Sequence, residues 1–415
     1  MVKQALNIGF FSSMYSQTNG TAHAVKFLAE AIAKLGHDVH VFAPKIINGH
    51  AMPQTLHYHE LGGAVVGDNT GFVVSLPIHK MFFCPHDYLD IAHLHTHATV
   101  ATMAINWAKY LGIPMVGTHN APLAYYTAQN VKLIGNIMSK SEFLWKYERH
   151  ILDKYDFVHV PTKSKKDLLL NYRFKEPIVC LSNGINDAMF TELKENGIRE
   201  KYAIEDKKVL LYAARLSTEK HPISILKAFR KIHEEVPDAH LLMVGSGGAS
   251  TEHVKRILKK KAYRDIASYA GRVPFVDLLR LYRAADVSCL YSWVEAEGLV
   301  LIEAMAQGTP SVGANATGIS NVIKHGETGY LVNNMDQFKD AVAKLLKDDD
   351  LREEFGKNAR KEAEKYRISK VAESWIKLYK FTMDELYPLR FHRRERQERV
   401  ELVKNFVKTI PNVSW

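Results

Sequence analysis

Residues 6–11, Leu-Asn-Ile-Gly-Phe-Phe, form a short apolar run, and residues 38–43, Asp-Val-His-Val-Phe-Ala, form another. Between them, over residues 21–35, apolar side chains recur at the spacing of a helix with one buried face. Gly36 ends this helical pattern. The segment therefore predicts a strand, a helix and a second strand, and because a helix connects the two strands, they are expected to run parallel.

The same alternation of strands and helices continues along the chain. In the first half, strands are expected at 91–94, 114–118, 157–160 and 178–181. Residues 191–208 are polar and interrupt the pattern, and a second series follows, with strands expected at 209–213, 240–244, 286–290, 310–313 and 330–332. Beyond Asp348 only helices are expected. The simplest architecture is α/β, with two doubly wound domains joined near residue 195.

Composition restricts the class of protein. With 415 residues, 47% hydrophobic and 24% charged, the chain is globular and longer than one ordinary domain, which excludes a disordered or collagen-like protein. No stretch approaches the roughly 18 apolar residues that span a bilayer, and the first apolar run is too short for a signal peptide. Three isolated cysteines favour a reducing, cytoplasmic compartment. The net charge of +10 suits an anionic partner, although ordinary solubility explains it equally well.

The ends of the predicted strands carry the residues most suited to chemistry, because ligands of open parallel sheets bind there. Arg215 and Lys220 follow the strand at 209–213, and a guanidinium with an ammonium group suits a diphosphate, although two solvated charges would look the same. Glu295 precedes a turn at Gly298, and Glu303 lies about one turn into the following apolar helix. A carboxylate there needs hydrogen bonds, which a ribose, a lysine or the backbone could supply.

Histidines supply weaker candidates. His119 follows the strand at 114–118, a position where a structural role is more common than a catalytic one. His93, His95 and His97 alternate along an expected strand and would share one face. Because neither a carboxylate nor a cysteine accompanies them, the sequence predicts no metal site.

Taken together and in this order, these segments resemble the retaining glycosyltransferases of family 4 over about residues 5–385. The most specific match is residues 295–310, Glu-Ala-Glu-Gly-Leu-Val-Leu-Ile-Glu-Ala-Met-Ala-Gln-Gly-Thr-Pro, which is similar to the family's pair of glutamates separated by seven residues. Supporting segments are Arg215 with Lys220, 182–186 with Phe190, 244–247, 271–274 and 326–332. The chain departs from the family pattern at Ala214, at Glu297 and at 317–321, where glycine, an aromatic residue and Gly-Gly-x-x-Glu are usual.

The resemblance implies the GT-B architecture, in which two Rossmann-like domains face each other across a cleft. Residues 1–190 would bind the acceptor, residues 191–365 would bind the nucleotide sugar, and the helices and basic tail of 366–415 would pack back on the first domain. The donor would be a UDP- or GDP-hexose, with no obligatory cofactor or metal.

The resemblance also implies a role for each candidate residue. Arg215 and Lys220 would bind the diphosphate and stabilise it as it leaves. Glu303 would hold the ribose hydroxyls, and Glu295 would hold the hydroxyls of the transferred sugar, beside which His119 would assist transfer. The catalytic set is then His119, Arg215, Lys220 and Glu295, and the donor site also includes Gly20, Gly245, Gly298 and Leu299.

The acceptor is expected to be a membrane lipid, because 19–21 and 117–120 look most like the lipid-glycosylating members of the family. Residues 132–175 contain ten Lys/Arg and five Asp/Glu, interleaved with apolar side chains. An anchor at an anionic membrane surface or a half-buried domain helix would both have this pattern. The residues assigned to the acceptor or the inner face of the membrane are Tyr125, Tyr126, Lys132, Lys140, Trp145 and Lys146.

The basic tail from Tyr387 onward could bind anionic headgroups or pack on the first domain. Packing of its apolar face is favoured, with its arginines left exposed, namely Arg393, Arg394, Arg396 and Arg399. Two other functions stay open. One is a soluble family 4 enzyme that glycosylates a sugar, a polysaccharide or a small metabolite, and the other is a degenerate nucleotide-sugar-binding or scaffold protein. No nucleic-acid-binding module is recognised, and the sequence predicts no oligomeric state.

Overall fold

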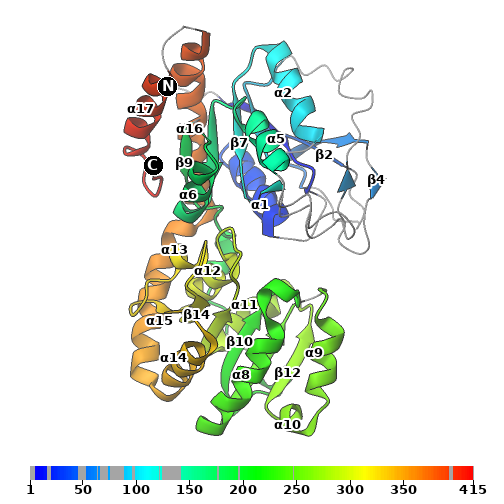
Figure 1. Ribbon diagram of the computed structural model, residues 1–415, viewed down its shortest axis with the longest axis vertical. Coiled ribbons are helices and arrows are strands. Elements are labelled where there is room, and N and C mark those ends of the chain that lie inside the picture. The colour runs from blue at the N-terminus through cyan, green and yellow to red at the C-terminus, as the bar shows by residue number, and fades with distance from the viewer. Residues whose placement is uncertain are drawn as a thin grey trace. The chain divides into compact units, whose positions relative to one another are not determined.

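The computed structural model describes residues 5–15, 20–44, 53–62, 64–65, 73–74, 88–95, 99–120, 122–123, 142–174, 177–194, 197–245, 247–391 and 396–414. The chain divides into two compact units (Figure 1). Unit 1 comprises Met1–Gly184 and Ile368–Trp415, and unit 2 comprises Ile185–Arg367. The divisions therefore follow Gly184 and Arg367, whereas the sequence places them after residues 190 and 365.

Unit 1 is built on a parallel sheet of seven strands in the order β3-β2-β1-β6-β7-β8-β9. These strands are β1 (Asn7–Phe11), β2 (Asp38–Pro44), β3 (Leu56–Leu61), β6 (Ile91–Leu94), β7 (Met115–Thr118), β8 (Phe157–Val160) and β9 (Ile178–Cys180). A separate antiparallel pair is formed by β4 (Ala64–Val65) and β5 (Val73–Val74). The helices of the first segment are α1 (Gly20–Lys34), α2 (Thr99–Leu111), α5 (Glu142–Leu152) and α6 (Lys163–Asn171).

The two faces of this sheet bury different helices, because successive side chains of a strand point to opposite faces. In β1, Phe10 packs with residues of α1 and α16 (Ile368–Phe381), whereas Phe11 packs with residues of α2 and α5. The C-terminal helices therefore complete one layer of unit 1, although they follow unit 2 in the chain (Figure 1).

The tail after α16 continues over unit 1 through a π-helical turn (Thr382–Leu386), a short 3-10 helix (Pro388–Phe391) and α17 (Arg396–Val407). Val403 and Val407 of α17 are fully buried in the same core as α16, which confirms the expected return to the first domain. The expectation of exposed arginines is wrong for Arg399, which is half-buried and donates to the Asp156 carbonyl oxygen at 3.0 Å. Arg393 and Arg394 lie outside the described residues.

Unit 2 contains a parallel six-stranded sheet in the order β12-β11-β10-β13-β14-β15. Its strands are β10 (Lys208–Ala213), β11 (Ala239–Val244), β12 (Ala267–Gly271), β13 (Val287–Leu290), β14 (Ser311–Ala314) and β15 (Gly329–Val332). Its helices are α7 (Ile198–Lys201), α8 (Pro222–Glu235), α9 (Thr251–Leu258), α10 (Lys261–Arg264), α11 (Phe275–Ala284), α12 (Leu299–Ala306), α13 (Ile319–Val322), α14 (Met335–Lys347) and α15 (Asp349–Ala363).

Both sheets follow one pattern, in which the first strand of the unit lies third from one edge and the order reverses beside it. The reversal falls between β1 and β6 in unit 1 and between β10 and β13 in unit 2. At such a point the connections leave two adjacent strands in opposite directions, and the opening at the carboxyl ends of those strands is where doubly wound proteins bind ligands. The fold therefore directs attention to the loops after β10 and β13.

Replacement of Trp375 by Ala is expected to destabilise unit 1 by about 3–5 kcal/mol, because the indole of α16 is buried against the sheet. Its ring lies 4.3 Å from the His93 ring and 4.8 Å from the His159 ring. Hydrogen exchange should show lost protection in α1 and α16 while unit 2 keeps its protection. Tyr110→Ala is the control, since Tyr110 is 85% exposed, and equal protection in both variants would contradict this packing argument.

Candidate active site

The point of reversal in unit 2 brings Lys220 and Glu295 into contact. Lys220 ends a 3-10 turn (Thr218–Lys220) after β10, and Glu295 lies in the loop after β13. The Lys220 Nζ donates to the Glu295 Oε1, and the two side chains are only 15% and 13% exposed. A cation and a carboxylate that are far apart in the sequence thus meet at the carboxyl edge of the sheet.

Arg215 occupies the same loop after β10 but is more open to solvent. Its side chain is 51% exposed, and its Nη2 lies 3.6 Å from the Glu219 Oε1. The backbone at this position is held firmly, because the Arg215 carbonyl accepts a hydrogen bond from the buried Tyr212 hydroxyl at 2.8 Å. The guanidinium is therefore anchored at its base and has room to move at its tip.

The Glu295 loop is positioned by a segment in which the chain departs from its family pattern. The Glu295 N–H donates to the Thr317 Oγ1 at 3.0 Å, and the Glu295 carbonyl accepts from the Gly318 N–H at 3.3 Å. A Cβ at Gly318 would lie 2.5 Å from the Ala296 carbonyl oxygen, so only glycine fits this approach. Thr317 was missed by the sequence reasoning, because nothing in the local pattern shows that it contacts Glu295.

Helix α12 presents Glu303 from a mostly apolar surface. The helix begins after Gly298, whose φ of +90° favours glycine. The N–H groups in the first turn of a helix have no partner within the helix. The Glu303 Oε2 accepts a hydrogen bond from the fully buried Tyr282 hydroxyl at 2.8 Å. Burial raises the pKa of Glu303 to about 7, against the opposing effect of the hydrogen bond from Tyr282.

Gly245 has a structural reason to be glycine. Its φ is +137°, and a Cβ there would lie 2.0 Å from the Ala214 carbonyl oxygen, so the loops after β11 and β10 approach each other closely. The Gly245 carbonyl also accepts from the Tyr269 hydroxyl at 2.8 Å. This glycine sets the spacing of the loop that carries Arg215.

In unit 1, His119 follows β7 and is completely buried. Its Nε2 lies 3.0 Å from the Glu148 Oε1 on α5. Gly20 is the exposed first residue of α1, and a Cβ added there would meet no atom within 4 Å. The space around Gly20 within the described residues thus does not require glycine.

The residues assigned to the acceptor fall partly outside the described chain, which is the case for Tyr125, Tyr126, Lys132 and Lys140. Trp145 is described and stacks on Tyr172, with ring centroids 3.5 Å apart and planes at 7°. Lys146 is exposed and pairs with Glu142 at 3.1 Å. None of the helices among the described residues is long and apolar enough to cross a membrane.

Of the three alternating histidines, His93 has a structural position. The His93 Nδ1 lies 2.6 Å from the Tyr379 hydroxyl, and its Nε2 lies 2.7 Å from the Thr118 Oγ1, so this ring joins α16 to the sheet. His95 is buried, and His97 lies outside the described residues. In the part of the chain that the structure describes, no group of three or more His, Cys, Asp or Glu side chains could hold a metal ion.

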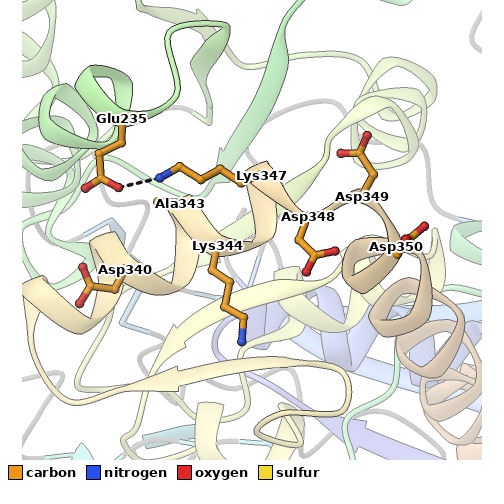
Figure 2. Close-up of a pocket in the computed structure, with 8 residues that line it drawn as sticks. All are labelled: Glu235, Asp340, Ala343, Lys344, Lys347, Asp348, Asp349 and Asp350. Carbon is orange, nitrogen blue, oxygen red and sulfur yellow. Dashed lines mark hydrogen bonds and ion pairs between the residues drawn. The ribbon is translucent and has the colours of Figure 1, made fainter.

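A charged surface hollow lies elsewhere on unit 2, beside α14 and the end of α8 (Figure 2). In Figure 2, Lys347 extends toward Glu235, and the atoms Nζ and Oε2 are 2.9 Å apart. The remaining lining residues are Asp340, Ala343, Lys344, Asp348, Asp349 and Asp350. Because the lining includes none of the strand-end residues, this hollow is separate from the candidate active site.

Two family descriptions match successive parts of the chain. Residues 18–188 match the glycosyltransferase family 4 domain, and residues 194–362 match the glycosyl transferases group 1 domain. Together they cover most of both units. The chain belongs to the family 4 glycosyltransferases, enzymes of the GT-B fold that transfer a sugar from a nucleotide sugar.

Individual relatives differ in the acceptors that their names contain. The chain is 25% identical over 392 residues to the N-acetyl-alpha-D-glucosaminyl L-malate synthase of Bacillus anthracis, a match that covers 90% of this chain and 96% of the relative. It is 27% identical over 355 residues to the alpha-monoglucosyldiacylglycerol synthase of Streptococcus pneumoniae, a match that covers 82% of this chain and 78% of the relative. The structure of HepE from Anabaena in complex with UDP and glucose has the same fold, with a TM-score of 0.70 and 13% identity. The match covers 90% of this chain and 99% of that chain.

The substitution Glu303→Gln is expected to stabilise unit 2 at alkaline pH. Because the folded state keeps the Glu303 proton up to about pH 7 and the unfolded chain releases it near 4.5, stability is lost as the pH rises through this window. At about pH 8 the variant should exceed the parent by roughly 3 kcal/mol, and at about pH 4.5 the two should agree.

Hydrogen exchange in β10 and β13 measures this difference in unfolding free energy. Glu354→Gln, at an exposed position of α15, serves as the control and should leave stability unchanged at both pH values. A Glu303→Gln variant that is no more stable than the parent at alkaline pH would show that burial of this carboxylate is not costly.

Proposed function

We propose that the protein is a retaining hexosyltransferase that moves a hexose from a UDP- or GDP-sugar to a membrane lipid without an obligatory metal ion. The observation that carries the proposal is the convergence of Lys220 and Glu295 at the point of strand reversal, with Arg215 in the same loop. The arrangement provides cations for a diphosphate and a carboxylate for sugar hydroxyls within one site.

In the proposed reaction the acceptor hydroxyl oxygen bonds to the anomeric carbon as the bond from that carbon to the diphosphate breaks. The bonding electrons stay on the leaving phosphate, which also accepts the acceptor's proton on the same face of the sugar. Negative charge therefore grows on the diphosphate, and Arg215 and Lys220 lower the barrier by stabilising it. Because Glu295 already pairs with the Lys220 ammonium group, the diphosphate would either displace the Glu295 carboxylate or share the ammonium group with it.

Glu303 would bind the ribose of the nucleotide. Its Oε2 accepts from Tyr282, and hydroxyl groups of a ribose that donate to this carboxylate would offset part of the cost of its burial. By its family likeness, His119 would assist transfer of the sugar.

A lipid acceptor is supported by the name of the diacylglycerol-glycosylating relative and by one surface of unit 1. This α5–α6 surface exposes Phe143 at 68%, Leu170 at 48% and Tyr172 at 40%. The same segments carry the cations Lys146, Arg149 and Arg173, of which Lys146 pairs with Glu142. Apolar side chains with a basic surround suit the boundary of an anionic membrane.

A soluble acceptor is the second candidate, and the L-malate synthase relative favours it because that match covers nearly the whole of both chains. A small anionic acid would need cations at the acceptor site rather than exposed apolar groups. A degenerate sugar-nucleotide-binding protein is a third possibility, against which stands the presence of Arg215, Lys220, Glu295 and Glu303.

Lys220→Ala and Glu303→Ala are each expected to lower sugar transfer at least about 100-fold without unfolding the chain, because each removes a charged contact with the donor. Transfer is measured with radiolabelled UDP- and GDP-hexoses and a total lipid extract, and folding is checked by circular dichroism. Lys347→Ala removes an exposed cation that pairs with Glu235 and should keep parental activity. Near-normal turnover in both site variants would refute the site assignment.

The lipid proposal predicts that the protein co-sediments with vesicles containing phosphatidylglycerol at low salt. Phe143→Ser combined with Tyr172→Ser should weaken this binding about 10-fold, equivalent to about 1.4 kcal/mol, because both side chains are exposed beside cations. Tyr110→Ser changes an aromatic side chain that is 85% exposed on α2 and should bind as the parent does. No binding of the parent protein to anionic vesicles would remove the lipid proposal in favour of the soluble one.

A further inference from the structure

We propose that Glu148 is a positioning residue for His119, whose carboxylate holds the imidazole in one orientation and fixes the ring nitrogen that carries the proton. The inference rests on the proposed function, in which His119 assists transfer of the sugar. Glu148 itself would not touch the substrate.

Glu148 lies on the buried face of helix α5. It lies on the face of α5 that also contains Leu144, Ile151 and Leu152, and all four side chains are buried. A carboxylate on a buried apolar face costs several kcal/mol unless it is paired. Its partners are the His119 Nε2 at 3.0 Å and the Leu123 N–H at 3.1 Å, both on Oε1.

Hydrogen bonds fix the backbone and the neighbours of His119. The His119 N–H donates to the His159 carbonyl oxygen at 2.8 Å. On one side, the Thr118 Oγ1 lies 2.9 Å from the His159 Nδ1, and on the other the Asn120 Oδ1 accepts from Asn183 at 3.0 Å. Within this framework, the contact with Glu148 orients the His119 side chain.

The contact with Glu148 also decides which ring nitrogen of a neutral His119 carries the proton. A carboxylate accepts hydrogen bonds, so the Nε2 of a neutral His119 carries the proton and donates a hydrogen bond to Glu148. The other ring nitrogen, Nδ1, is then the acceptor. An acceptor nitrogen in a fixed direction suits a sugar hydroxyl, which donates. A carboxylate partner that sets the tautomer of a functional histidine is a known way to prepare a site before substrate binds.

The expected result for Glu148→Gln is a fall in kcat of about 10-fold with little change in the KM for the donor, because the amide keeps the shape but loses the charge. In the His119→Ala background the same substitution should add no further loss, since its effect acts through the imidazole. Glu142→Gln, on the exposed first turn of α5, is the matched control and should behave as the parent.

The outcomes separate the two proposals. If the parent protein transfers no sugar, the proposed function fails, and if Lys220→Ala and Glu303→Ala both keep near-normal transfer, the site assignment fails. If His119→Ala keeps parental transfer, the role of His119 fails. If His119→Ala loses activity while Glu148→Gln does not, or if Glu148→Gln lowers kcat equally in both backgrounds, the inference about Glu148 is overturned and the proposed function stands.

A measurement on the parent protein keeps the inference testable even if Glu148→Gln folds poorly. The ¹⁵N shifts of the imidazole in histidine-labelled protein, assigned by comparison with His119→Ala, should report a proton on Nε2. A neutral ring with its proton on Nδ1 would overturn the proposal.

Discussion

Lys220 and Glu295 meet because the strand order of unit 2 reverses between β10 and β13. The reversal puts the loops after these two strands beside each other, and these loops, with the helix that continues the second, carry the charged candidates of unit 2. Arg215 precedes Lys220 in the first, while Gly298 and α12 continue the second. Close approach of backbones at Gly245 and Gly318 keeps the loops in place, since a Cβ at either position would collide with a carbonyl oxygen.

The charges of this site are balanced before any ligand is considered. Lys220 pairs with Glu295, and Arg215 lies near Glu219, so each of these two cations has a carboxylate nearby. A partly buried cation without a partner would destabilise the fold. The pairing lets the protein keep positive charge at the edge of the sheet, at the cost that an anionic ligand must compete with a carboxylate.

Sequence reasoning placed the candidate residues at strand ends, because strand ends can be found from the strands alone, but it did not identify the residues that contact them. Thr317, Tyr282 and Glu148 contact Glu295, Glu303 and His119 through the tertiary fold, although Glu148 had a signal in its helical spacing from Leu144 and Ile151. The strands β3 and β12 were missed as well. Both lie at sheet edges and are only partly buried, so their sequences lack the continuous apolar run of an inner strand.

Each unit keeps one carboxylate on an otherwise apolar helix face, with Glu303 on α12 and Glu148 on α5. Each accepts a hydrogen bond from a buried ring, the phenol of Tyr282 in unit 2 and the imidazole of His119 in unit 1. These bonds, with a second to Glu148 from the Leu123 N–H, only partly offset the desolvation of a carboxylate, and an apolar residue would pack there at less cost. Stability alone therefore does not account for these two glutamates. The proposed donor binding would account for Glu303, and the proposed orientation of His119 would account for Glu148.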